Sequence, residues 1–121
     1  MEKKKSVNKV VGSKGESLAA DFLVRKGYEI LERNFRYGRG EIDLIARRGN
    51  LITFCEVKTR RSRVYGVGED AVDSKKQNQI RTVAEGYTMT RDLASSDFRF
   101  DVIVVEMMGK TTTIRFIENA F

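Results

Sequence analysis

Charged side chains interrupt the apolar strand-like runs of residues 40–61, which read GEIDLIARRGNLITFCEVKTRR. Two strand-like runs, EIDLIA and LITFCEVK, flank a Gly-Asn pair and carry Glu41, Asp43, Glu56 and Lys58. Burying two like charges without compensation costs roughly several kcal/mol. An interaction that offsets this cost is therefore expected near these side chains.

A divalent cation bound between two carboxylates would offset their repulsion. A tight turn at Gly49 and Asn50 predicts that Asp43 faces Glu56 directly across the hairpin. Opposed Cβ atoms in an antiparallel pair are about 4.5–5.5 Å apart, so two carboxylates there repel each other unless a cation binds between them. Oxygen ligands without His or Cys favour Mg²⁺ or Mn²⁺. Lys58 follows Glu56 by two residues, so it projects from the same strand face.

Ordinary structural roles are the alternatives. In the same register Glu41 faces Lys58, and an exposed cross-strand ion pair of this kind contributes under about 1 kcal/mol. Glu16 ends the run SKGE, which fits a capping box in which the glutamate only satisfies backbone donors at a helix start. Both roles stay open for Glu16, a helix cap or a ligand.

The chain has no histidine and one cysteine, Cys55. A Ser-His-Asp triad and a His- or Cys-cluster zinc site are therefore excluded, and acid–base or metal chemistry must use carboxylates, Lys or Tyr. Cys55 lies among apolar strand residues, which is typical of a small buried hydrophobic side chain.

The positive charge is concentrated in the half of the chain that holds this hairpin. The net charge is +6, and residues 1–63 carry 16 Lys/Arg against 8 Asp/Glu. A basic surface favours a polyanionic partner, first of all nucleic acid. The candidate phosphate contacts follow the hairpin or begin the second helix: Arg60, Arg61, Arg63, Lys75 and Lys76. The alternative is that these side chains only form a solvated basic surface.

The elements that must position these residues follow from hydrophobic periodicity. Residues 14–26 have helical spacing of apolar side chains and end at Gly27, and a second helix begins at Ser74 with a capping box to Gln77. Strands are expected at about 28–36, 41–47, 51–58, 98–107 and 111–121. The order α-β-β-β-α-β-β predicts an α/β fold with one mixed five-stranded sheet flanked by helices.

Length and hydropathy bound the remaining possibilities. A chain of 121 residues suits one domain, 1–121, and we expect residues 1–12 to be a flexible basic tail. No apolar run approaches the roughly 18–20 residues of a membrane span, and no apolar stretch follows the basic start as in a secretory signal. A cytoplasmic location and no membrane partner are expected.

The hairpin resembles a nuclease motif. An Asp, a variable spacer and Glu-x-Lys on adjacent strands, here Asp43, Glu56 and Lys58, resemble the PD-(D/E)xK nuclease superfamily, with Ile42 at the position of its proline. More of the chain is similar to the YraN-like family of bacterial predicted endonucleases, which is similar in turn to archaeal Holliday junction resolvases. The similar segments are KGESLAADFLVRKGY, GEIDLIARRGNLITFCEVKTR, the helix with Lys75, RFDVIVV and the terminal ENAF.

This resemblance implies a restriction-endonuclease-like core. It implies Asp43 and Glu56 as metal ligands, Lys58 as the catalytic lysine and Glu16 as an accessory carboxylate. The expected activity is Mg²⁺- or Mn²⁺-dependent hydrolysis of phosphodiester bonds, in DNA more than RNA, and branched DNA is suggested by the resolvases. Pairing of two subunits, as in the resolvases, is a further hypothesis.

Two other classes compete with the enzyme. A non-cleaving nucleic-acid-binding protein could keep the same fold, although all three core positions of the motif are intact here. A structural or ribosome-associated basic protein would have no use for facing carboxylates.

Overall fold

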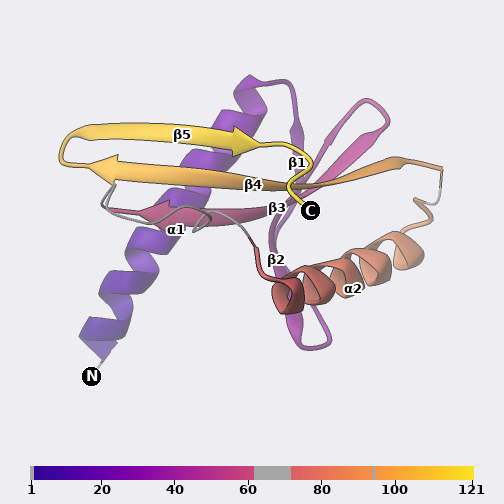
Figure 1. The fold of residues 1–121 in the computed structure, drawn as a ribbon, viewed down its shortest axis with the longest axis horizontal. Coiled ribbons are helices and arrows are strands. Elements are labelled where there is room, and N and C mark those ends of the chain that lie inside the picture. Colours follow the sequence, from indigo (N-terminus) through magenta and orange to yellow (C-terminus); the bar gives the residue numbers. More distant parts are fainter. Residues whose placement is uncertain (1, 62–71, 94) are drawn as a thin grey trace.

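A five-stranded sheet with one helix on each face makes up the described part of the chain (Figure 1). The structure is a computed structural model that describes the backbone of residues 2–61, 72–93 and 95–121, and side chains from residue 13 onward within these ranges. The elements, in chain order, are α1 (Glu2–Arg25), β1 (Glu29–Tyr37), β2 (Gly40–Arg48), β3 (Leu51–Arg60), α2 (Ser74–Thr90), β4 (Asp97–Met108) and β5 (Thr111–Ile117). The predicted order α-β-β-β-α-β-β and the α/β class are confirmed.

The strands lie in the sheet in chain order, β1-β2-β3-β4-β5. Every neighbouring pair is antiparallel except β3 and β4, which are parallel over the whole of β3. A parallel pair requires a crossover connection, and α2 lies within that connection.

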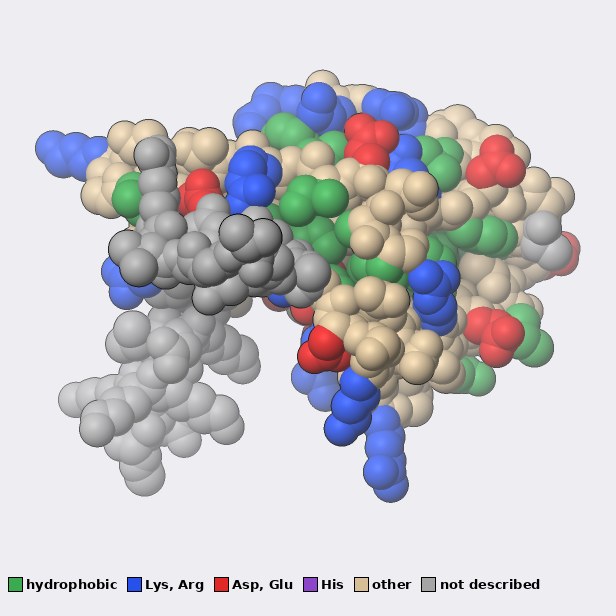
Figure 2. Space-filling model, viewed as in Figure 1, with side chains coloured by type: hydrophobic (Ala, Val, Ile, Leu, Met, Phe, Trp, Pro, Cys, Tyr) green, Lys and Arg blue, Asp and Glu red, His purple; other side chains and the backbone are tan. Residues whose placement is uncertain are grey.

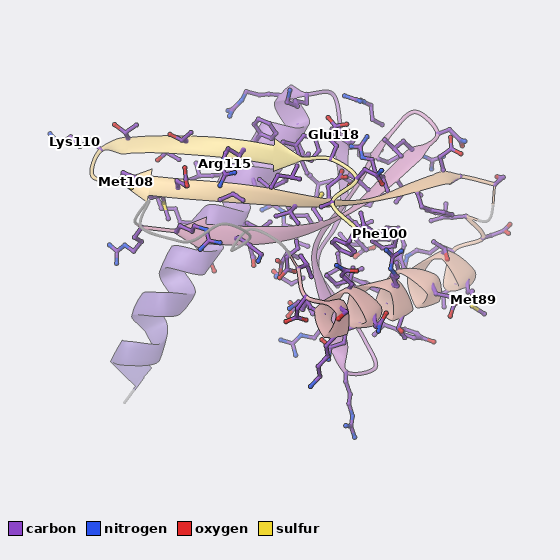
Figure 3. All side chains as sticks on the ribbon, viewed as in Figure 1. Met89, Phe100, Met108, Lys110, Arg115 and Glu118 are labelled. Carbon is purple, nitrogen blue, oxygen red and sulfur yellow. The ribbon has the colours of Figure 1, made fainter. Side chains whose placement is uncertain are left out.

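Each face of the sheet has its own hydrophobic core. Side chains of α1 such as Leu23 pack with Leu44, Cys55 and Ile103 on one face. Those of α2 such as Ile80 pack on the other face with a second set of strand residues. Figure 3 shows Phe100 between β4 and α2, whereas Met108 and Lys110 lie at the β4–β5 turn, away from α2.

Helix α1 is longer than its periodicity predicts. It begins at Glu2 and not near residue 14; Glu2 to Lys5 are good helix formers, and the glycine at position 12 costs only about 1 kcal/mol. It ends as expected. Gly27 has a positive φ of 93°, and Tyr28 N donates to Leu23 O at 3.0 Å, the backbone bond of a Schellman cap.

Helix α2 begins one residue away from the expected cap. Asp73 is the N-cap, and its carboxylate accepts from Lys76 N at 2.8 Å. The predicted capping box from Ser74 to Gln77 is therefore wrong. Gln77 instead donates from its side chain to Val72 O at 2.7 Å, just before the helix.

A buried polar cluster around Asp101 attaches the end of the chain to the sheet. The Asp101 side chain is 0% exposed and accepts from the Thr53 hydroxyl, from Arg99 Nε at 2.8 Å and from Asn119 N at 2.8 Å. Arg99 also donates to the Tyr28 hydroxyl at 2.8 Å. Because each partner satisfies a buried polar atom, Asp101 and the terminal ENAF segment have a structural role here.

Substituting Asp101 should therefore strongly destabilise the fold. We expect Asp101→Ala to lower the free energy of unfolding by about 2–4 kcal/mol, because it removes the shared acceptor of three donors in the cluster. The Arg99 guanidinium keeps a second carboxylate partner, Glu118, at 3.2 Å. Urea unfolding monitored by circular dichroism measures the loss. Asp97→Ala removes an exposed carboxylate and is the matched control, with an expected change under about 1 kcal/mol. Equal losses in the two variants would contradict a structural role for the Asp101 cluster.

Candidate active site

Strands β2 and β3 separate at Asp43. Their antiparallel ladder runs from Arg48–Leu51 to Leu44–Cys55, which is the register expected from a Gly49–Asn50 turn. The ladder stops at that pair. The prediction that Asp43 and Glu56 pair directly across the hairpin is therefore wrong. Strand β1 continues beside β2 as far as the Tyr37–Gly40 pair, while β3 continues along β4.

The Asp43 side chain compensates for the lost backbone partner. Its Oδ2 accepts from Val57 N at 2.8 Å. A buried backbone N–H must be hydrogen-bonded, and in a continued ladder the acceptor would come from the backbone of β2. The Asp43 carboxylate therefore accepts the hydrogen bond of the Val57 backbone N–H at the point where β2 separates from β3.

The β1–β2 hairpin twists at the same point. Asn34 on β1 has a positive φ of 52°, a conformation that Asn tolerates better than most residues. Leu44 packs in the α1-side core and Ile42 in the α2-side core, although residues two apart on a regular strand share one face. The hairpin thus turns toward α2 beyond Asp43, as Figure 1 shows.

Glu56 lies close enough to Asp43 to perturb the Asp43 carboxyl. Burial and the neighbouring Glu56 carboxylate raise the pKa of Asp43 to about 7, and the hydrogen bond from Val57 N opposes the rise. Asp43 therefore retains its proton over much of the range in which an ordinary aspartate is ionised. The carboxylate proximity predicted from sequence is present, although the strands do not pair at these two residues.

Glu56 also has a cationic partner on α2. Lys76 Nζ lies 3.5 Å from Glu56 Oε2, and the Glu56 side chain is only 14% exposed. Lys58 is half-buried, and regular pairing of β3 with β4 along its length places it on the Glu56 face. The site thus combines two carboxylates with ammonium groups from β3 and α2.

Glu16 reaches this region from α1. Its Oε1 accepts from Asn34 Nδ2 at 3.1 Å. Burial raises the pKa of the Glu16 carboxyl, Asn34 lowers it, and the charges of Asp43 and Glu41 raise it further. Because α1 starts at Glu2, Glu16 lies inside the helix, and the capping-box interpretation is wrong.

A glycine allows α1 to approach β3 at this end of the sheet. A Cβ at Gly15 would overlap the Thr59 side chain. The contact places the turn of α1 that carries Glu16 directly against the strand that carries Glu56 and Lys58. Sequence reasoning did not identify Gly15 or Asn34 as part of the site, and the only local signal was an Asn within a strand-like run.

The remaining predicted residues are distributed around this centre. Glu41 does not pair with Lys58 as expected, because β2 has already left β3; its carboxylate lies 3.8 Å from Arg36 on β1. Arg60 ends β3 and Arg61 is exposed just after it. Arg63 lies outside the described residues.

The donor set suits a cation held by a carboxylate pair. Over residues 13–61, 72–93 and 95–121, no three acidic or cysteine side chains converge into a metal-binding group. Mg²⁺ in phosphate-processing sites is commonly held by one or two carboxylates, with water and substrate phosphate as the other ligands. Two adjacent, partly buried carboxylates satisfy that requirement. Cys55 takes no part, since it is buried and burial raises the pKa of its thiol to about 12.

Comparison with known proteins identifies the family. Residues 15–105 match the model described as "Uncharacterised protein family UPF0102". The chain belongs to the UPF0102 family. A UPF0102 protein of Alkaliphilus metalliredigens is 44% identical over 115 residues, which cover 95% of this chain and 100% of the relative. One from Geobacter metallireducens is 49% identical over 114 residues, covering 94% and 93% of the two chains.

The matched region includes every element of the candidate site. It begins at Gly15, contains Glu16, both carboxylates and Lys58, and ends within β4. The family description states no activity, so the nuclease assignment is argued below from the residues. Neither α1 nor α2 contains, in its described part, an apolar stretch that could cross a membrane.

The raised pKa of Asp43 predicts a pH-dependent gain in stability on neutralising it. Because the folded pKa, about 7, exceeds the ordinary value of 3.8, ionising Asp43 opposes folding, and stability is lost as pH rises between these values. Without divalent cations, Asp43→Asn should raise the free energy of unfolding by about 1–3 kcal/mol at pH 8 and change it little at pH 4.

Urea unfolding in EDTA at the two pH values measures the difference. The asparagine can still accept from Val57 N, so the substitution removes charge while preserving the strand contact. Asp21→Asn, at an exposed position on α1, is the control for loss of one negative charge. An Asp43→Asn variant destabilised equally at both pH values would contradict repulsion at the carboxylate pair.

Proposed function

We propose that this UPF0102 protein is a metal-dependent endonuclease that hydrolyses phosphodiester bonds in nucleic acid, with DNA as the expected substrate. The observation that carries the proposal is the Asp43–Glu56 pair at the separation of β2 from β3, with Lys58 on the same strand face as Glu56. A purely structural ion pair would not need two adjacent carboxylates, one of which has its pKa raised to about 7 by burial and by the other.

Asp43 and Glu56 would hold Mg²⁺ or Mn²⁺, with Glu16 as an accessory carboxylate on the α1 side. When bound, the cation would neutralise the pair and act as a Lewis acid toward the scissile phosphate. Asp43 also remains anchored to Val57 N, so one ligand is fixed in orientation by the β3 backbone.

Lys58 would stabilise the negative charge that develops on the phosphate oxygens, or orient the attacking water. Its backbone is held on one side by β4, because Lys58 pairs with Val104. Lys76 compensates Glu56 in the metal-free protein and adds a second cation from α2. These positions support recognition of a phosphodiester without contact to a particular base.

The basic residues around the site favour a polyanionic substrate. Figure 2 shows Lys and Arg side chains grouped at the lower end of the view, where Figure 1 places the β1–β2 turn and the start of α2. Basic side chains beside an acidic centre attract the phosphate backbone while leaving the carboxylates available for a cation.

Metal binding should be detectable without any substrate. We expect Mg²⁺ and Mn²⁺ to raise the melting temperature of the wild type at pH 8, because a ligand that binds only the folded state stabilises it. Asp43→Asn and Glu56→Gln should reduce this shift strongly. Differential scanning fluorimetry with Ca²⁺-free buffers measures it, and Asp21→Asn is the control. An equal shift in all variants would assign the cations to another part of the surface.

Cleavage is the decisive test. A panel of linear, flapped and four-way DNA substrates should be cut by the wild type in Mg²⁺ or Mn²⁺ and not in EDTA. Asp43→Asn, Glu56→Gln and Lys58→Met should each lower the rate by about 10²-fold or more while leaving DNA binding in EDTA largely intact. Cleavage that persists in EDTA or in Asp43→Asn would reject the site. Binding without cleavage by the wild type would favour the non-cleaving alternative.

A further inference from the structure

A groove of ≈ 370 Å³ lies between the β1–β2 turn and the first half of α2, beside the candidate active site. The lining residues come from these two segments only: Tyr37, Gly38, Arg39, Gly40, Lys75, Asn78, Gln79, Thr82 and Val83. Its volume is within the range of small-molecule sites in proteins, about 300–1,000 Å³.

Two close contacts fix the walls of this groove. A Cβ at Gly40 would lie 2.5 Å from Val83 Cγ2, and a Cβ at Gly86 would lie 2.6 Å from Tyr37 Cζ. Glycine at both positions thus lets the hairpin turn sit directly on α2. The Tyr37 ring rests on Gly86, although the residue remains 45% exposed.

The chemistry of the lining matches one nucleotide. Tyr37 and Val83 provide an aromatic ring and an apolar wall, Asn78 and Gln79 provide amide groups, and the cations Arg39 and Lys75 are part of the lining. No acidic residue lines the groove in the described part of the chain. Sites for single-stranded nucleic acid combine an aromatic stacking surface with positive charge in this way.

The groove adjoins the carboxylate site along two elements. Gly40 is three residues from Asp43 on β2, about 10 Å along a strand. On α2, Lys75 lines the groove and the next residue, Lys76, contacts Glu56. A strand with its phosphate at the carboxylates can therefore place a neighbouring nucleotide at the groove.

We infer that this groove binds an unpaired nucleotide flanking the scissile phosphate, with the base against Tyr37 and the backbone phosphate at Arg39 and Lys75. The inference rests on the proposed function in taking nucleic acid as the ligand. It adds a preference for substrates with a single-stranded segment next to the cleavage point, because a paired base cannot leave its stack without an energetic cost.

The chain contains no tryptophan, so a single introduced one reports on the groove directly. Tyr37→Trp should lose fluorescence when titrated with a single-stranded DNA oligonucleotide in EDTA, because the base stacks on the indole ring. Met89→Trp, 76% exposed near the other end of α2, is the matched control and should change much less (Figure 3). Equal quenching at both positions, or none at Tyr37→Trp while the oligonucleotide binds, would overturn the inference.

Affinity measurements separate stacking from general electrostatic attraction. Tyr37→Leu should weaken single-strand binding by about 5- to 100-fold, whereas Tyr37→Phe should stay close to the wild type. Lys75→Ala should weaken it and reduce the salt dependence by about one phosphate contact, while Lys110→Ala, at the distant β4–β5 turn, removes the same charge with little effect. Equal effects of the two lysine variants, or none for Tyr37→Leu, would contradict a groove-bound nucleotide.

The two proposals fail in different ways. Quenching at Tyr37→Trp together with absent cleavage by the wild type would support the groove and reject the endonuclease. Cleavage that is unchanged in Tyr37→Leu, and equal on blunt duplex and flapped DNA, would support the endonuclease and reject the groove.

Discussion

The hydrogen bond from Val57 N to the Asp43 carboxylate is the contact on which the site depends. It satisfies a backbone donor of β3 that has lost its partner on β2, so the two strands can separate without leaving a buried N–H unpaired. One side chain thus ends a β-ladder and carries charge into the gap that results. A neutral apolar residue at this position could do neither.

Separation of the strands gives the two halves of the sheet different roles. Strand β3 stays with β4 in the centre and fixes Glu56 and Lys58 on one face, because parallel pairing continues to Arg60. Strand β2 leaves with β1 and carries its turn onto α2, where Gly40 and Gly86 allow the backbone and the Tyr37 ring to approach closely. The carboxylate pair and the adjacent groove are therefore both consequences of one twist in the hairpin.

The electrostatics of the site follow from its position between two helices. Burial and the Glu56 carboxylate disfavour ionisation of Asp43, and Lys76 from α2 lies 3.5 Å from Glu56 Oε2. Glu16 from α1 adds negative potential from the other side. Ionising both carboxylates is therefore unfavourable, and a bound cation would reduce the repulsion between them.

The elements, their order and the hairpin register near the turn can be predicted from the amino-acid sequence alone. Local signals suffice for these features: Gly49–Asn50 specifies a tight turn, alternation marks the strands, and Gly27 ends α1 with a left-handed residue. The sequence also identified Asp43 and Glu56 as neighbours, because the register set by the turn holds as far as the adjacent Leu44–Cys55 pair.

The contacts that those residues make depend on how the helices and strands pack together. The separation of β2 from β3 came from a side chain replacing a backbone acceptor, and the pairing of Glu56 with Lys76 came from α2 packing on the sheet. The contact of Glu16 with Asn34, 18 residues away, required α1 to dock through Gly15. None of these contacts has a local sequence signal, because each depends on the relative placement of elements that only packing of the two cores fixes.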